Sequence, residues 1–125
     1  KIQIQGDFSM LARYVQKGES IDYRPSGAVA AGDVIVIANL IGVARLDIAA
    51  NTLGSLAVVG VFDVSKAAGA IAAGAAVYWD AANHAVTTVA AGNPYLGKAV
   101  LAAEAADETA RVLLNAPFVV TAAAE

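Results

Sequence analysis

The chain has 125 residues, no cysteine and a formal net charge of −3, with 58% hydrophobic and 15% charged residues. This length suits one domain, the lack of cysteine excludes a disulfide-stapled miniprotein, and the hydrophobic content excludes intrinsic disorder. The charge offers no basic surface for nucleic acid, and the longest uncharged apolar runs, 34–44 and 67–79, fall short of the roughly 18 residues of a membrane-spanning helix.

The low number of charged side chains predicts contact with other chains. Only 8 basic and 11 acidic residues are available to cover the folded surface, whereas about 25–35% of a typical soluble surface is charged. We therefore expect a homo-oligomer or docking against another protein. The alternative is that the many alanines, which are small, lie in water without a partner.

The ends of the chain differ in character from the region between them. Residues 1–9 alternate apolar and polar positions up to Gly6, which is typical either of a vector-derived leader or of an N-terminal arm that adds a strand to a neighbour. Residues 10–116 are predicted to form a single β-rich domain. Residues 117–125 are predicted to form a C-terminal tail that wraps a neighbour or frays.

Short β-branched or alternating segments separated by glycine predict an all-β fold, either a small β-barrel or a β-sandwich-like domain. The run 34–37 is β-branched throughout, which predicts a strand with both faces covered. Gly69 and Gly74 limit any helix in 67–76 to one short turn, and Trp79 is expected in the core. The predicted strands are 20–24, 34–37, 40–44, 55–61, 62–64, 77–79, 85–89, 96–101 and 111–114, with a four-residue hairpin loop at 80–83.

An internal repeat indicates two related β units. The segment GAVAAG at 27–32 returns as GAIAAG at 69–74, and LIGVA at 40–44 is echoed by YLGKA at 95–99. The second spacing is longer because the hairpin around 80–83 is inserted. Two copies are too few for a solenoid, so a paired or closed β domain is expected.

The sequence contains no recognisable catalytic set. His84 is the only histidine, and without cysteine neither thiol catalysis nor a thiolate metal site is possible. Ser65, His84 and Asp80 show no triad pattern, and His84 is expected to face solvent in the hairpin turn. We therefore expect no enzyme activity, no cofactor and no metal.

The glycines at 27 and 32 have the spacing of a phosphate-binding loop, which would suggest an ATP-dependent recombinase. Such a loop requires Lys followed by Ser or Thr to meet the phosphates and Mg²⁺. Asp33 and Val34 follow instead, and the carboxylate of Asp33 would repel a phosphate. The spacing alone therefore does not support that activity.

Eight collinear motifs together carry a family resemblance. They are ARYVQKGE at 12–19, IDY at 21–23, VAAGDV at 29–34, IGVA at 41–44, GVFDVSK at 60–66, VYWD at 77–80, LGKA at 96–99 and RV at 111–112. Over about residues 10–115 the chain resembles phage or prophage capsid cement (decoration) proteins of the domain-of-unknown-function family numbered 2190.

This resemblance implies a structural virion protein, commonly a homotrimer, that binds the outside of a phage head and bridges major capsid subunits. Its expected location is the capsid surface of the virion, after assembly in the host cytoplasm. Because the segment 12–17 opens the similar region, we predict capsid contact by Arg13, Tyr14, Val15 and Lys17. An ordinary edge strand is the alternative for this segment, and another β-rich phage assembly module, from a tail or baseplate, is the alternative function.

Overall fold

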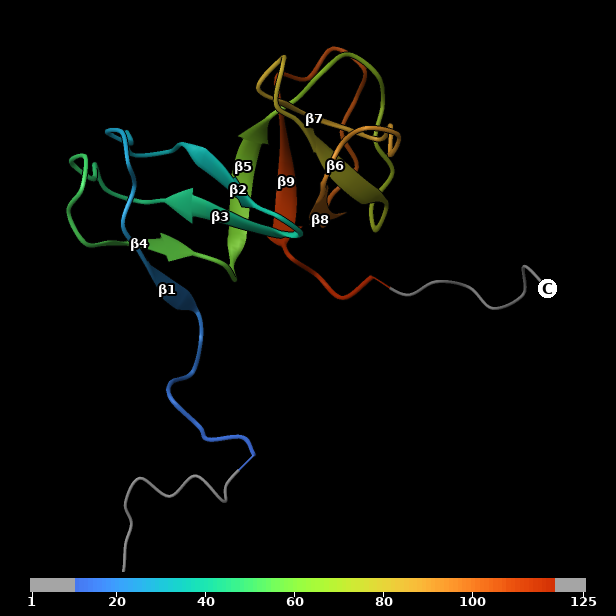
Figure 1. Ribbon diagram of the computed structural model, residues 1–125. Helices are drawn as coiled ribbons and strands as arrows, with labels where there is room; N and C mark the ends of the chain where they lie inside the picture. The colour runs from blue at the N-terminus through green and yellow to red at the C-terminus, as the bar shows by residue number, and fades with distance from the viewer. Residues whose placement is uncertain (1–10, 119–125) are drawn as a thin grey trace, which may run out of the picture.

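The computed structural model describes residues 11–118 and contains β-strands as its only regular elements there. The nine strands are β1 (Ser20–Tyr23), β2 (Val34–Ile37), β3 (Leu40–Ala44), β4 (Gly54–Ala57), β5 (Val61–Ser65), β6 (Ala76–Asp80), β7 (Ala85–Thr87), β8 (Tyr95–Ala99) and β9 (Thr109–Leu114). They form two antiparallel sheets, β1-β4-β3-β2 and β5-β9-β8-β6-β7 (Figure 1). The sheets do not close into a barrel, so the all-β prediction is confirmed in its sandwich-like form.

Each predicted strand overlaps an observed one, and the predicted ends that were wrong include those of β4 and β8. β4 stops at Ala57 instead of residue 61, and the chain bends at Val59 and Gly60, which has a φ of 136°, so residue 61 already belongs to β5. β8 stops at Ala99, and the chain bends over the next two residues. The hairpin loop is 81–84 instead of 80–83, because Asp80 is paired with Ala85 as the last rung of the ladder.

The two units predicted from the repeat are visible in the strand order. In the first unit the order is β1-β4-β3-β2, and in the second β5-β9-β8-β6 follows the same sequence of connections. Only the second unit has a fifth strand, β7, which pairs with the outer edge of β6. The inserted hairpin that lengthens the second repeat is therefore an added strand.

The repeated glycine segments form equivalent turns. The amide of Gly32 donates to the carbonyl of Ala44 at 2.6 Å, and the amide of Gly74 donates to that of Ala99 at 2.7 Å. Both glycines have positive φ, 92° and 83°, a conformation that glycine adopts without the penalty of a side chain. The repeat thus encodes the same corner twice.

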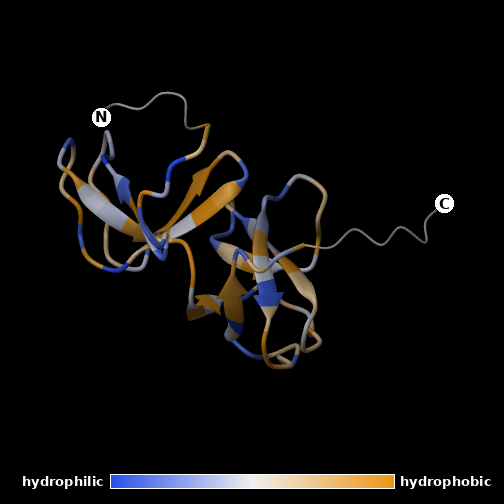
Figure 2. Ribbon diagram, turned by 90° about the horizontal axis from the view of Figure 1, so that it is seen from below, coloured by the Kyte–Doolittle hydropathy of each residue, from blue (hydrophilic) through white to orange (hydrophobic). Residues whose placement is uncertain are grey.

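Hydrophobic side chains form a large core and a small one. The small core consists of Val29, Ala44, Ile48 and Leu56 and lies on the face of the first sheet that points away from the second sheet. The large core consists of Ile41, Val43, Val64, Ile71, Val77, Trp79, Val86, Leu96, Ala99, Ala103, Ala110, Val112 and Leu114. It includes two residues of β3, so the first sheet packs on the second through that strand, and Figure 2 shows hydrophobic residues along strands of both sheets. Trp79 lies in this core, as predicted.

A single amide side chain ties the two sheets together. Asn115 follows β9, and its Nδ2 donates to the carbonyls of Ile41 in β3 and Val58 after β4, both at 2.8 Å. Its Oδ1 accepts from the amide of Ile41 at 3.4 Å. Asn115 has a φ of 54°, which asparagine tolerates better than most residues. This contact joins the end of the second unit to the first.

Within residues 11–118, no helix is long and apolar enough to cross a membrane. The predicted leader or arm at 1–9 and most of the predicted tail, from residue 119 onward, lie outside the described residues.

Candidate functional site

Residues 11–17, here called the arm, extend from the first sheet without packing on it (Figure 1). Tyr14 and Val15 are 80% and 78% exposed. The only hydrogen bond that the structure shows for the arm, within the described part of the chain, joins Gln16 Nε2 to the carbonyl of Ser20 at 2.7 Å. The arm therefore presents its backbone and its side chains to whatever surrounds the protein.

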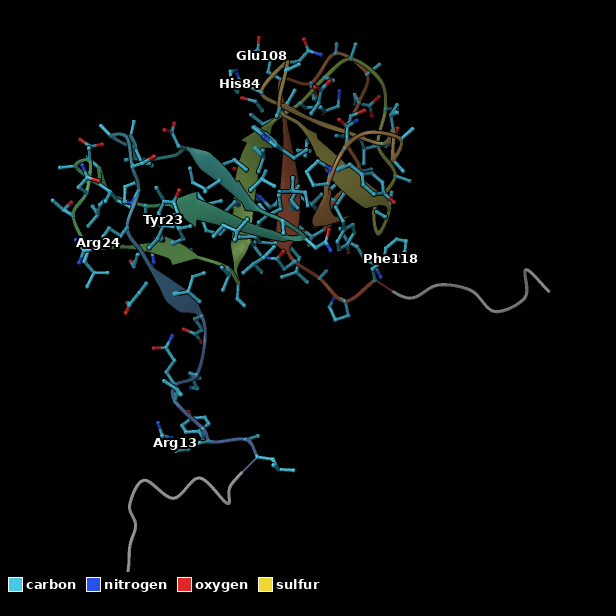
Figure 3. All side chains as sticks on the ribbon, in the orientation of Figure 1. Arg13, Tyr23, Arg24, His84, Glu108 and Phe118 are labelled. Atoms are coloured by element: carbon cyan, nitrogen blue, oxygen red, sulfur yellow. The ribbon has the colours of Figure 1, made fainter. Side chains whose placement is uncertain are left out.

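All four predicted contact residues lie on the arm and are exposed: Arg13, Tyr14, Val15 and Lys17. Figure 3 shows Arg13 well away from both sheets. The alternative of an edge strand in the chain's own sheet is wrong, because the first paired residue is Ser20. The structure brings these residues together on one segment, and their contact with a capsid stays a prediction.

Charge is divided unequally between the arm and the body. The arm carries two basic side chains, Arg13 and Lys17, and no acidic one. Residues 20–118 carry five basic and eight acidic side chains, so the body is acidic. An acidic surface on a second chain would attract the arm over about one Debye length, roughly 8–10 Å at physiological salt.

The outer strand β2 is more exposed than its composition predicted. Val36 and Ile37 are 40% and 37% exposed, so the expectation that both faces of this strand are covered is wrong for its second half. β2 is the outermost strand of its sheet, and a β-branched run does not distinguish an outer strand from a central one. Within residues 11–118 no strand pairs with the outer edge of β2, a structural feature that the sequence did not reveal.

An aromatic cluster, also missed, lies on the second sheet. The rings of Tyr78 and Tyr95 are 5.9 Å apart and those of Tyr95 and Phe118 are 5.1 Å apart, both edge to face. Tyr95 Oη donates to the carbonyl of Ala116 at 2.6 Å, and burial raises the pKa of Tyr95. The cluster holds residues 116–118 against the sheet. In the sequence, Phe118 after Pro117 was the feature that could have indicated this contact.

The polar residues considered for catalysis are not joined. His84 is exposed in the 81–84 loop, with its ring centroid 6.5 Å from that of Trp79. In the part of the chain that the structure describes, no hydrogen bond links Ser65, His84 and Asp80, and no three His, Asp or Glu residues could hold a metal. The repeated glycine segments are β-turns with no following helix there, unlike a phosphate-binding loop.

Asp80 instead organises the hairpin loop. Its Oδ2 accepts from Asn83 Nδ2 at 2.7 Å, and its Oδ1 accepts from the amides of Ala82 and Asn83 at 3.1 and 3.2 Å. These bonds favour the carboxylate, so the pKa of Asp80 is lowered, chiefly by the Asn83 side chain. Asp63 is similar, because its hydrogen bond to Arg111 at 2.9 Å lowers its pKa.

The substitution Asn83→Ala is expected to raise the pKa of Asp80 toward its ordinary value, because the main cause of the lowering is removed. A carboxyl group whose pKa is lowered by folding stabilises the fold above its unfolded pKa, and this stabilisation is lost as pH falls through the folded value. The variant should therefore lose less free energy of unfolding than the unaltered protein does when the pH falls through the titration range of Asp80. NMR titration of the Asp80 carboxyl carbon measures the shift.

The matched control is Asn39→Ala, which changes an exposed asparagine in the turn between β2 and β3. It should leave the Asp80 titration unchanged. An identical Asp80 titration curve in Asn83→Ala and in the unaltered protein would contradict the assignment.

Comparison with protein families identifies the chain. A model of the phage cement protein family matches residues 15–114, which is most of the chain. The chain belongs to the phage cement protein family. Membership gives this cement protein a capsid-associated structural role and places it on the virion capsid. The match begins inside the arm, at Val15, and it includes both β units. No curated protein and no solved structure gave a significant match.

Proposed function

We propose that this phage cement protein binds the outside of a phage head and stabilises the shell by bridging major capsid subunits, acting as a homotrimer. The observation that supports the proposal most directly is the arm, in a chain of this family, with exposed basic and apolar side chains and no strand partner among residues 11–118. Exposed aromatic and arginine residues are the types that most often dominate binding energy.

The mechanism needs affinity but no reactive group. A protein that binds the assembled shell and not its dissociated subunits stabilises the shell by mass action. A trimer that touches several subunits at once gains avidity, so each contact can be modest. Arg13 and Lys17 would pair with acidic groups on the shell, while Tyr14 and Val15 would bury apolar surface.

The test is cosedimentation of the purified protein with heads that lack decoration. The unaltered protein should pellet with the heads at a saturating, fixed number of copies per capsid. The double variant Arg13→Ala/Lys17→Ala should bind about tenfold more weakly, because the loss of two ion pairs at about 0.7 kcal/mol each adds to about 1.4 kcal/mol. Light scattering of the free protein measures its oligomeric state.

The matched control is Arg45→Ala/Lys98→Ala, which removes the same charge from the body at residues that make no side-chain hydrogen bond within residues 11–118. It should pellet like the unaltered protein. Equal weakening by both double variants would show only a general charge effect. Failure of the unaltered protein to pellet, with binding to isolated tails or baseplates, would instead support the alternative assembly role.

A further inference from the structure

The duplication shows where an additional strand fits on the first sheet. In the second unit, β7 pairs antiparallel along the outer edge of β6 through Tyr78, Trp79 and Asp80. The first unit has the same strand order but ends at β2, the counterpart of β6. The position beside β2 is therefore the one that β7 fills in the other unit, and within residues 11–118 no strand fills it.

The edge of β2 lacks the features that usually prevent strand addition. Edge strands are commonly protected by a charged side chain, a proline, a bulge or a covering segment. The other three edge strands have such features: β1 contains Asp22 and β5 contains Asp63. The edge of β7 is covered where the amide of Ala67 donates to the carbonyl of Val86 at 3.0 Å. β2 reads Val-Ile-Val-Ile without a charge or a proline, and no segment among residues 11–118 pairs with its outer edge.

The backbone of β2 is oriented to accept a strand. The carbonyl of Asp33 accepts from the amide of Ala44 in the direction of β3. Since an antiparallel strand alternates the direction of its polar groups, Ile35 and Ile37 also face β3, and Val34 and Val36 point their amides and carbonyls outward. No hydrogen bond reaches these outward groups from elsewhere in the described ranges. They offer two rungs of a new ladder.

A cleft beside this edge can take side chains from an added strand. It has a volume of about 330 Å³ and lies between residues 32–35 on one side and Ser65, Trp79 and His84 on the other. A second hollow of about 210 Å³ adjoins it and is lined in part by Phe62 and Val64. Alternate side chains of a strand laid along β2 would point toward these hollows.

We propose that the arm of one copy adds as an antiparallel strand to the β2 edge of a second copy. The arm is extended and unpaired within the described residues, it contains the strand-forming residues Tyr14 and Val15, and its positive charge is opposite to the net charge of the body of a second copy. The arm and the β2 edge are different surfaces, so their contact is heterologous and can close into a ring. The proposal rests on the homotrimer of the proposed function.

This pairing is compatible with capsid contact by the same segment. A strand uses its backbone for the ladder and directs its side chains alternately to the two faces. With the backbone of the arm held by the neighbouring copy, one row of side chains can pack into the cleft while the other faces the shell. Assembly of the ring would then order the arm for binding to the head.

Disulfide trapping tests the pairing, because the natural chain has no cysteine. Four arm variants, Arg13→Cys, Tyr14→Cys, Val15→Cys and Gln16→Cys, are each mixed with a mass-tagged Val36→Cys chain. Oxidation is done in solution and on undecorated heads. Tagged covalent dimers should form with arm positions two residues apart and about tenfold less with the positions between them, since strand side chains alternate.

The control acceptor is Leu46→Cys, an exposed position in the loop after β3, which should give only background dimer. Absence of the tagged dimer with all four arm variants, or equal yields at all four, would overturn the proposal. So would an intramolecular disulfide without any dimer in a chain carrying both cysteines, because that result places the arm on its own β2.

A second variant separates pairing from folding. Val36→Pro removes an outward amide that β3 does not use, and edge strands accept proline at such positions. Val36→Pro should weaken the association between copies, and with it the binding to heads, at least about tenfold, because hydrogen bonds of the added ladder are lost. Val36→Thr keeps the amide and should weaken neither. Thermal unfolding verifies that Val36→Pro is folded. If the protein pellets with heads but no disulfide dimer forms, the pairing is overturned and the cement role stands. If the dimer forms in solution but the protein does not pellet with heads, the pairing stands and the cement role is overturned.

Discussion

Replacing Asn115 by alanine should destabilise the protein by about 3 kcal/mol. The substitution removes both Nδ2 hydrogen bonds that join β3 and the segment after β4 to the end of β9. Leaving buried main-chain partners unsatisfied costs about 1–3 kcal/mol, and an alanine at a φ of 54° adds about 1 kcal/mol of backbone strain. Urea unfolding followed by circular dichroism measures the change in the free energy of unfolding.

Asn51→Ala is the matched control. Asn51 also has a positive φ, 61°, but it is exposed and its hydrogen bonds in the structure pass through its main chain. Its replacement should cost only the strain, about 1 kcal/mol. Asn115→Gly relieves the strain and should still cost about 2 kcal/mol. Equal losses in Asn115→Ala and Asn51→Ala would contradict the role of Asn115 as the joint between the sheets.

Gly97→Ala should be the most damaging small change in the second sheet. A Cβ atom at Gly97 would overlap the carbonyl oxygen of Leu113 in the adjacent strand β9 and crowd the side chain of Val112. Because the main chain of a paired strand cannot move aside locally, β8 and β9 would have to separate. Overpacking of this kind commonly costs about 1–3 kcal/mol, and we expect the upper end or more.

Gly27→Ala serves as the control for this substitution. Nothing lies within 4 Å of a Cβ built at Gly27, and the residue has no positive φ. Its replacement should change stability by less than about 0.5 kcal/mol, as is usual for surface positions. The comparison uses thermal unfolding of both variants. A melting temperature for Gly97→Ala equal to that of the control would contradict the packing described for β8.

The elements of the fold were predictable because each strand carries a local signal. Alternation in 20–24, β-branching in 34–37 and the aromatic pair Tyr78 and Trp79 all mark strands. The repeated glycine segments predicted the two units, because the same corner recurs with the same hydrogen bonds. The ends of β4 and β8 were less predictable, because apolar residues continue past both strands into turns.

The long-range features could not be read from the sequence. Nothing near Asn115 indicates that its side chain reaches Ile41, 74 residues earlier, and nothing in the β-branched run of β2 shows that it is the outermost strand of its sheet. The segment with the predicted contact residues was chosen because it opens the region that resembles the family, and its separation from the described strands follows only from the pairing of β1 with β4. Sheet order, a property of the whole chain, decides which edges are open.

The two hydrophobic cores differ greatly in size, and this difference affects the order in which parts of the molecule unfold. Four buried residues hold the outer face of the first sheet, whereas thirteen form the main cluster. Local opening requires less free energy where fewer apolar contacts are lost. On heating, β1 and β4 should therefore loosen before the strands of the second unit. A partner bound through the arm, which precedes β1, would then be released before global denaturation. On cooling, only the first sheet would need to refold before the protein rebinds.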